Sequence, residues 1–201
     1  MKNYIYASIL AFMLSNPMMA QQDDKRTTTT KIADLLATQP AQNADKLSSA
    51  MMQLEGFTAE DISNLLLQLK PQGGDNAKIE YATNSYAYYV MQSGKEAQRA
   101  KFVQGVLQAL TKLTDKDNKG YALNLLINAG KDDAVPALAG YLQDDYLGDR
   151  AARTLARIKS QPAGKALADA LPNAKGRNIV YILEAIGDAG YVEGEKAVIP
   201  F

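Results

Sequence analysis

Apolar residues recur with a helical period along residues 117–201, and the whole pattern repeats about every thirty residues. Two apolar positions are present in all three copies, at spacings of 29 and then 28 residues: Leu126, Leu155 and Leu183 form the first, and Ala129, Ile158 and Ile186 the second. A fixed period near thirty that holds two helical patterns is typical of an α-solenoid. The sequence therefore predicts an all-α fold, an α-solenoid of stacked antiparallel helical hairpins.

Each copy is predicted to hold two short helices. In the first copy, the apolar stripe over residues 121–129 predicts a helix that ends at Gly130, because glycine takes a left-handed C-terminal conformation at little cost. The second helix is expected to begin with Asp132 or Asp133 as its cap. Pro136 falls in its first turn, where the missing N–H does little harm.

The other two copies follow the same plan. The second copy pairs a helix over residues 151–158 with one that starts at Pro162. In the third copy, a helix over residues 179–186 is expected to be followed by a longer, glycine-rich turn before Val198. The leucines of the second helices are predicted to join the core, and these are Leu138, Leu142, Leu167 and Leu171.

Two segments carry a resemblance to a repeat family. Residues 135–138 (Val-Pro-Ala-Leu) and 199–201 (Ile-Pro-Phe) each follow a helix that ends in an apolar residue and glycine. This arrangement resembles HEAT-like repeats, of a subclass shorter than the ~40–47 residues of ordinary HEAT repeats. The resemblance implies HEAT-like repeats over residues 115–201. It also implies a parent sequence that continues beyond Phe201, because the chain stops inside an expected helix.

A more specific resemblance is carried by residues 74–82 (GDNAKIEYA), 88–90 (YYV) and 130–138 (GKDDAVPAL). These resemble the helical N-terminal region of secreted bacterial proteins with a C-terminal 3-keto-disaccharide hydrolase, or laminarinase-like, β-sandwich domain. The resemblance covers the mature chain but only the helical part of that family. It implies a missing glycoside-acting domain, and no position here matches that domain's functional residues.

The N-terminal residues predict export. Residues 1–20 have the features of a signal peptide: Lys2, an apolar run over residues 4–14 that is too short for a membrane span, and Ala20 at the cleavage site. Residues 21–30 are polar and predict a flexible leader. The mature protein is therefore expected to be periplasmic or extracellular, without a membrane-spanning segment.

Residues 31–114 predict helical hairpins of irregular length ahead of the regular repeats. The expected helices cover residues 31–37, 43–54, 58–69, 77–92 and 96–113. Asn43 is a predicted N-cap, and Thr58 with Asp61 forms a predicted capping box. Atypical units at the end of a repeat array are expected.

Composition excludes several kinds of chemistry. The sequence has no His and no Cys, so ordinary zinc and copper sites and Ser-His or Cys-His catalysis cannot be built. Its zero net charge argues against non-specific nucleic-acid binding. Residues 115–120 match a calcium loop in part, but Lys119 and Leu126 stand where oxygen ligands are needed. We interpret this segment as a turn capped by Asp117 or Asn118, and expect no cofactor.

Several polar residues are candidates for an interaction surface. The second helices of such repeats usually line a concave face, which points to Tyr141, Lys165 and Asp169. Tyr88 is expected to be exposed, whereas its neighbours Tyr86 and Tyr89 join the core. Three arginines lie on one side of a predicted helix: Arg150, Arg153 and Arg157. They are expected to form either a solvated face or a binding site for an anionic ligand.

The sequence favours a non-catalytic function. The leading hypothesis is an exported α-solenoid that acts as an interaction or scaffold module for a protein partner, a glycan or its own C-terminal domain. The alternative is the helical N-terminal region of a glycoside-acting hydrolase whose catalytic domain is absent from this chain. Neighbouring carboxylates such as Asp132 and Asp133 are better explained as helix-start residues than as an acid–base pair.

Overall fold

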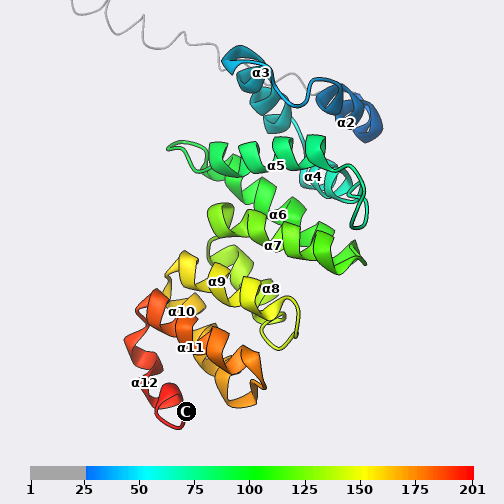
Figure 1. Ribbon diagram of the computed structural model, residues 1–201. Helices are drawn as coiled ribbons and strands as arrows, with labels where there is room; N and C mark the ends of the chain where they lie inside the picture. The colour runs from blue at the N-terminus through cyan, green and yellow to red at the C-terminus, as the bar shows by residue number, and fades with distance from the viewer. Residues whose placement is uncertain (1–25) are drawn as a thin grey trace, which may run out of the picture.

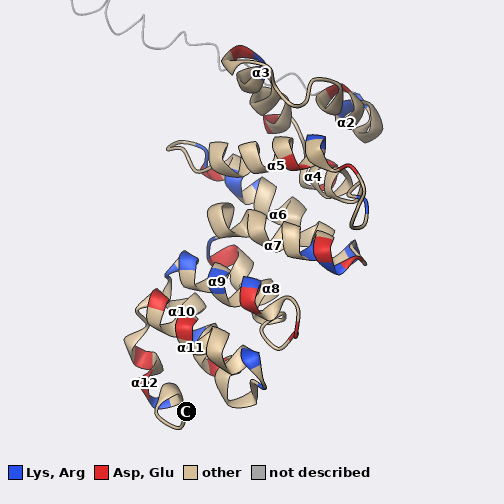
Figure 2. Ribbon diagram, viewed as in Figure 1, with Lys and Arg blue, Asp and Glu red and all other residues tan. Residues whose placement is uncertain are grey.

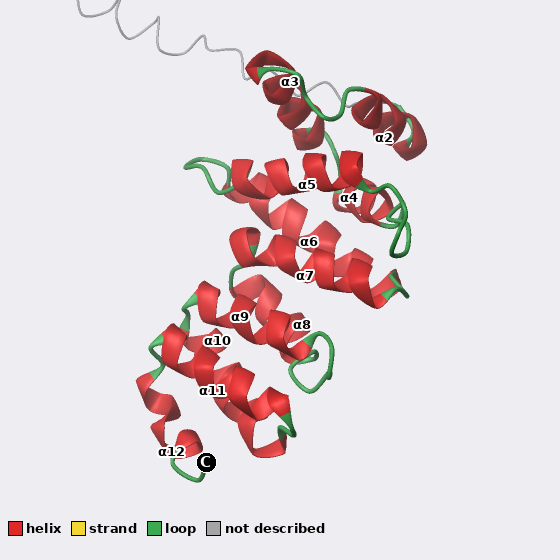
Figure 3. Cartoon of the chain, in the orientation of Figure 1, coloured by secondary structure: helices red, strands yellow, loops and turns green. Residues whose placement is uncertain are grey.

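The computed structural model describes residues 26–201, and this part of the chain is helical without strands (Figure 3). The all-α prediction is confirmed for these residues, while the predicted signal peptide and residues 21–25 lie outside them. The α-helices are α2 (Thr28–Ala37), α3 (Ala44–Glu55), α4 (Ala59–Leu66), α5 (Ala77–Tyr89), α6 (Glu96–Lys112), α7 (Lys116–Ala129), α8 (Val135–Ala139), α9 (Gly148–Ile158), α10 (Gln161–Ala170), α11 (Arg177–Ala189) and α12 (Glu195–Val198). Short 3-10 helices are η1 (Asp132–Ala134), η2 (Leu171–Asn173) and η3 (Val192–Gly194).

The helices pack in two rows. In one row α3 contacts α5, α5 contacts α7, α7 contacts α9, and α9 contacts α11. In the other, α2 contacts α4, α4 contacts α6, α6 contacts η1, and α8, α10 and α12 follow. The rows are joined where α6 packs on α7, α8 on α9, and α10 on α11. The helix pairs follow one another from α2 and α3 at one end to α12 at the other (Figure 1).

Local capping chemistry sets several helix starts as predicted. The Asn43 side chain accepts the Lys46 N–H at 2.9 Å, so Asn43 is the N-cap of α3. At the start of α4, the Thr58 hydroxyl accepts the Asp61 N–H at 3.1 Å, and the Asp61 carboxylate accepts the Thr58 N–H at 2.9 Å. This reciprocal pair is the predicted capping box.

The predicted leader is too long at its C-terminal end. Residues 28–30 form the first turn of α2, and the Thr27 hydroxyl caps that helix by accepting the Thr30 N–H at 3.2 Å. Thr28 is held further by donating its hydroxyl hydrogen bond to Asp61 of α4. A run of threonines, which are weak helix formers, is therefore ordered by a cap and by a tertiary contact.

The predicted caps of α7 and of the segment after it are also wrong. Asp115, rather than Asp117 or Asn118, is the N-cap of α7, accepting the Asn118 N–H at 2.9 Å. The Asn118 side chain instead donates to the buried Leu69 carbonyl at 3.1 Å. No side chain caps η1 or α8. The Asp133 carboxylate instead accepts the Lys131 N–H at 3.2 Å and pairs with Arg99 of α6, also at 3.2 Å.

The third copy of the sequence pattern has a different register from the one predicted. α9 and α11 both end on a left-handed residue, Lys159 at φ 54° and Gly190 at φ 66°. When the two helices are aligned on these left-handed residues, Leu155 and Ile186 occupy equivalent positions, and both are buried. Leu183 is only half-buried. The helix α11 extends to residue 189 and η3 begins at residue 192, so the expected long turn is absent. Gly187 lies within the helix instead of ending it.

The core runs continuously between the two rows. The leucines of the first two copies are completely or almost completely buried, as predicted: Leu126, Leu138, Leu142, Leu155, Leu167 and Leu171. Close helix approach also depends on Gly105 of α6, where an added Cβ would lie 2.6 Å from the Ile62 Cβ of α4. Only a residue without a side chain lets α4 and α6 pack at this distance.

Candidate interaction surface

α9 carries four charged residues, Asp149, Arg150, Arg153 and Arg157. The helix lies between α7 and α11 and buries Ala151, Ala152 and Leu155 against them. Basic and acidic residues follow one another along its ribbon, blue and red in Figure 2. Because the buried positions recur at helical spacing, Arg153 and Arg157 are left on the opposite, exposed face.

Arg150 is engaged within the protein. Its Nη1 donates to the Tyr146 carbonyl at 3.2 Å, and its guanidinium lies 5.1 Å from the centre of the Tyr146 ring. The Lys116 ammonium lies 4.4 Å from the same ring, and the Tyr146 hydroxyl donates to Asp117. That hydrogen bond raises the pKa of Tyr146 above its ordinary value. These contacts tie the loop before α9 to the start of α7, so Arg150 helps to hold α9 against α7.

Arg153 and Arg157 line a shallow cleft of about 290 Å³ between α9 and α11. The other lining residues are Ala156, Lys159 and Asp188. Arg153 forms an ion pair with Asp149 one turn earlier on α9, with 2.7 Å between Nε and Oδ1. This hydrogen bond raises the pKa of the Arg153 guanidinium.

The other two cations of the cleft differ from Arg153. Within residues 26–201, Arg157 and Lys159 form no hydrogen bond or ion pair through their side chains, and Asp188 forms none either. Lys159 is also the one residue other than glycine with a positive φ among the described residues. The cleft thus combines two uncompensated cations with an uncompensated carboxylate.

Tyr88 projects from α5, and 66% of its surface is exposed. Its neighbours pack as predicted: Tyr86 is fully buried, stacks on Tyr89 with ring centres 5.8 Å apart, and meets Phe102 edge-on at 5.4 Å. Burial raises the pKa of Tyr86 strongly. Tyr88 therefore stands apart from the aromatic cluster and from the cleft beside α9.

The candidates on the second helices lie in the other row. Tyr141 follows α8, is half-buried, and its hydroxyl is 3.5 Å from the Leu110 carbonyl of α6. Burial raises the pKa of Tyr141. On α10, Lys165 and Asp169 form an exposed ion pair at 2.5 Å, one helical turn apart. Exposed pairs of this kind contribute little to stability, because solvent screens them.

The predicted surface residues therefore fall into separate groups. The structure brings Arg153 and Arg157 together in one cleft and Lys165 and Asp169 into one pair, but it does not unite the two groups. Sequence reasoning missed Lys159 and Asp188, the other charged residues of the cleft. The signal that could have found Lys159 is its position directly after a helix, where glycine is usual.

Comparison of the chain with family models, with curated proteins and with solved structures found no match. The case for a function therefore rests on the geometry of the chain itself.

A second cleft lies at the C-terminal end of the rows and was not predicted. It has a volume of about 400 Å³ and lies between α11 and the η3–α12 segment, lined by Ile186, Tyr191, Val192 and Val198 among others. The nearby Ile199 and Phe201 are also exposed, at 73% and 55%. These residues leave apolar side chains exposed at the C-terminal end of the rows.

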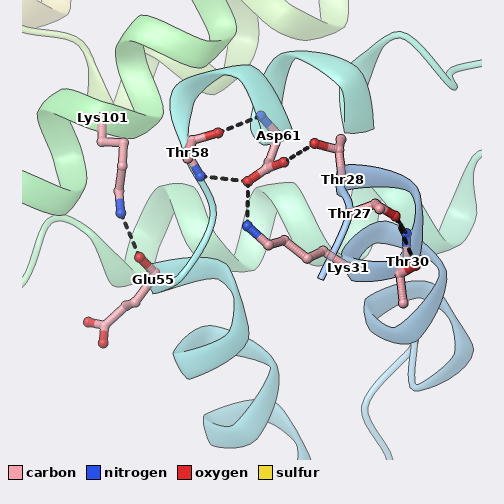
Figure 4. A network of polar contacts seen from close by, with 8 residues as sticks. All are labelled: Thr27, Thr28, Thr30, Lys31, Glu55, Thr58, Asp61 and Lys101. Carbon is pink, nitrogen blue, oxygen red and sulfur yellow. Dashed lines mark hydrogen bonds and ion pairs between the residues drawn. The ribbon is translucent and has the colours of Figure 1, made fainter. Parts of the chain in front are cut away.

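A buried polar network lies at the N-terminal end and joins α2 to α4 (Figure 4). The Lys31 ammonium pairs with the Asp61 carboxylate at 3.1 Å, and both side chains are less than 10% exposed. Burial alone would raise the pKa of Asp61, but hydrogen bonds from Thr28, Thr58 and Lys31 hold it below its usual value. Every charged group in this pair has a partner, which indicates a structural role.

Two properties of the described residues bear on membranes and metals. None of the helices in residues 26–201 combines the length and the apolar character needed to cross a bilayer. The same residues contain no group of three or more acidic side chains placed to hold a metal ion.

Proposed function

We propose that this chain is an exported, non-catalytic α-solenoid that serves as an interaction or scaffold module. The observation that carries the proposal is the pair of helix rows, in which neighbouring helices of a row contact one another and the two rows also contact each other (Figure 1). In a solenoid each repeat contacts only its neighbours, and the rows leave long faces open to partners.

The surface supports binding at more than one place. The charged cleft beside α9 and the apolar cleft at the C-terminal end lie on different parts of the array. An apolar end surface suits contact with more folded protein, either a partner or a C-terminal domain of a longer parent. The HEAT-like resemblance agrees with this arrangement.

The chemistry of the charged cleft favours binding over hydrolysis. Ordinary glycosidases need two carboxylates about 5–5.5 Å or 6.5–9.5 Å apart across a substrate cleft, with one pKa raised. Asp188 is the single carboxylate lining the charged cleft, and nearby Asp149 is held by Arg153. The sequence also lacks His, the usual general base near neutral pH.

A second function is favoured by the apolar C-terminal end. The chain would then be the helical N-terminal region of a glycoside-acting hydrolase, and the cleft beside Ile199 would pack against its catalytic β-sandwich domain. The same resemblance of residues 74–82 and 130–138 supports this alternative. Under either function, the described helices bind and position rather than react.

Site-specific photo-cross-linking would test the proposal. A photoreactive residue is placed at Tyr88, Arg157, Lys165 or Ile199 of the full chain in its native host, with Gln72, in an exposed loop, as the control position. We expect discrete cross-linked species from one or two of the four positions and none from Gln72. Cross-links that are absent throughout, or equal at all five positions, would contradict an interaction module.

An activity assay tests the alternative at the same time. The purified full chain is expected not to turn over a panel of glucosides and 3-keto-glycosides, with or without chelator. Turnover that survives repurification and is abolished by replacing one particular Asp or Glu would overturn the non-catalytic function.

Export has a direct test. Because Lys2, the apolar run over residues 4–14 and Ala20 together match a signal peptide, the secreted protein is expected to begin at Gln21. N-terminal sequencing of material from the periplasm or medium measures this. Recovery of the protein from the cytoplasm with Met1 intact would show that export is wrong.

A further inference from the structure

The cleft beside α9 holds charges that the protein does not neutralise. Arg157 and Lys159 have no hydrogen-bonding or ionic partner within the described residues, whereas Arg153 at the same cleft is paired with Asp149. A carboxylate one helical turn away can neutralise such a cation, as Asp169 does for Lys165 at 2.5 Å. Here two cations from the end of one helix line the same hollow without such a partner.

The backbone at Lys159 is a second, independent observation. Lys159 takes the left-handed conformation at φ 54°, which is unfavourable for a residue with a side chain. The corresponding residue at the end of α11 is Gly190, also left-handed, and glycine adopts this conformation without strain. A lysine at this position accepts a conformational cost and places its ammonium in the cleft. Strain of this kind is concentrated at functional sites.

Asp188 supplies the third element. It lines the cleft from α11, opposite α9, and its carboxylate has no ionic partner in the described part of the chain. A bound anion alone would be repelled by this group. A ligand that also carries a hydroxyl or ammonium group could donate a hydrogen bond to it.

We propose that this cleft binds a small dicarboxylate that carries a hydroxyl or ammonium group. One carboxylate pairs with the Arg157 guanidinium, whose planar fork matches a carboxylate in two parallel hydrogen bonds. The other lies against the Lys159 ammonium, and the donor group faces Asp188. The volume of about 290 Å³ suits a molecule of this size and is close to the lower end of ligand sites. The proposed function counts this cleft among the binding surfaces of the array, and binding of a small dicarboxylate here would stand even if the array bound no macromolecule.

Calorimetric or NMR titration at constant ionic strength tests the site with defined probes. We expect the full chain to bind malate and aspartate, which carry two carboxylates and a donor. Succinate, which lacks the donor, malamide, which lacks the carboxylates, and inorganic sulfate are each expected to bind about tenfold more weakly or not at all. Equal binding of malate, succinate and sulfate would show non-specific ion pairing and overturn the proposal.

Two variants link binding to the named cations. Replacement Arg157→Gln is expected to weaken malate binding about tenfold, the effect of losing roughly 1.4 kcal/mol of charge-assisted hydrogen bonding. Replacement Lys159→Gly is expected to weaken binding to a similar extent while keeping the melting temperature, because glycine suits the left-handed backbone. That variant therefore separates loss of the site from loss of the fold.

The matched control is Arg177→Gln, at an exposed arginine that begins α11 and does not line the cleft. It removes the same charge and should leave malate affinity unchanged. If malate binds the parent but Arg157→Gln and Lys159→Gly bind as tightly as Arg177→Gln, the site is elsewhere and the proposal fails. It also fails if the parent chain shows no binding of malate or aspartate.

Discussion

Replacement of Asp61 by alanine is expected to destabilise the protein by about 3–5 kcal/mol. The Asp61 carboxylate accepts hydrogen bonds from the Lys31 ammonium at 3.1 Å and from the Thr58 N–H at 2.9 Å, and it also accepts one from the Thr28 hydroxyl. Its removal leaves a buried ammonium without a counter-charge. It also leaves the start of α4 without half of its capping box.

Urea denaturation of the full chain measures this effect, and Asp34→Ala is the matched control. Asp34 pairs with Arg26 at 2.5 Å, but its side chain is 49% exposed, and exposed pairs contribute only about 0–1 kcal/mol. A double variant, Lys31→Met with Asp61→Asn, is expected to recover part of the loss, because no charge is then buried alone. If Asp61→Ala and Asp34→Ala had equal effects, the buried pair would not stabilise α2 against α4.

The contribution of Asp61 should depend on pH in a defined direction. Its pKa is held below the usual value in the folded protein, so the folded state favours the ionised carboxylate. The stabilisation is therefore complete above the unfolded pKa, about 3.9, and is lost as the pH falls through the lower folded pKa. The stability difference between the parent and Asp61→Asn should accordingly be constant near neutral pH and shrink only below about pH 4.

Leu155→Ala is expected to cost about 2–5 kcal/mol, as large-to-small changes in a well-packed core do. Leu155 is completely buried on α9, which packs between α7 and α11. The cavity would therefore weaken two neighbouring interfaces of the array. Thermal and urea unfolding, followed by two probes to check for a single transition, measure the change.

Leu183→Ala is the informative comparison for this prediction. The spacing of the sequence pattern makes Leu183 the equivalent of Leu155. In the structure the position equivalent to Leu155 is occupied by Ile186, and Leu183 is half-buried. Ile186→Ala should therefore resemble Leu155→Ala, while Leu183→Ala should cost clearly less. Equal losses for Leu155→Ala and Leu183→Ala would favour the register expected from sequence spacing over that of the structure.

Local interactions explain why much of the helical content could be predicted from the sequence. A cap such as Asn43, or the Thr58–Asp61 capping box, joins residues only three apart, so it can be predicted from the sequence. Apolar spacing at helical period likewise marks the buried face of a helix, and it placed Leu126 and Leu155 in the core. Neither capping residues nor apolar spacing predicts how far a helix continues once neighbouring helices pack against it. For this reason α11 ends at residue 189, beyond its predicted end at residue 186.

The candidate site was predicted only in part, for a related reason. Arg153 and Arg157 are four residues apart on α9, so helical periodicity alone predicts that they share one exposed face. Asp188 reaches the same cleft from α11, and its place there depends on the register between two helices. The left-handed conformation of Lys159 depends on where α9 ends, a boundary that the apolar pattern leaves open by a residue or more.

By itself the sequence determined the helical class, several helix starts, the buried leucines and the absence of histidine and cysteine chemistry, because each depends on residue type or on near neighbours along the chain. Only the tertiary structure decided which distant residues meet. The pairing of Lys31 with Asp61, thirty residues apart, and the joining of α9 and α11 around one cleft are examples. Such long-range contacts are set by the packing of whole helix faces. The register of that packing depends on side-chain shape across the interface rather than on spacing within either helix.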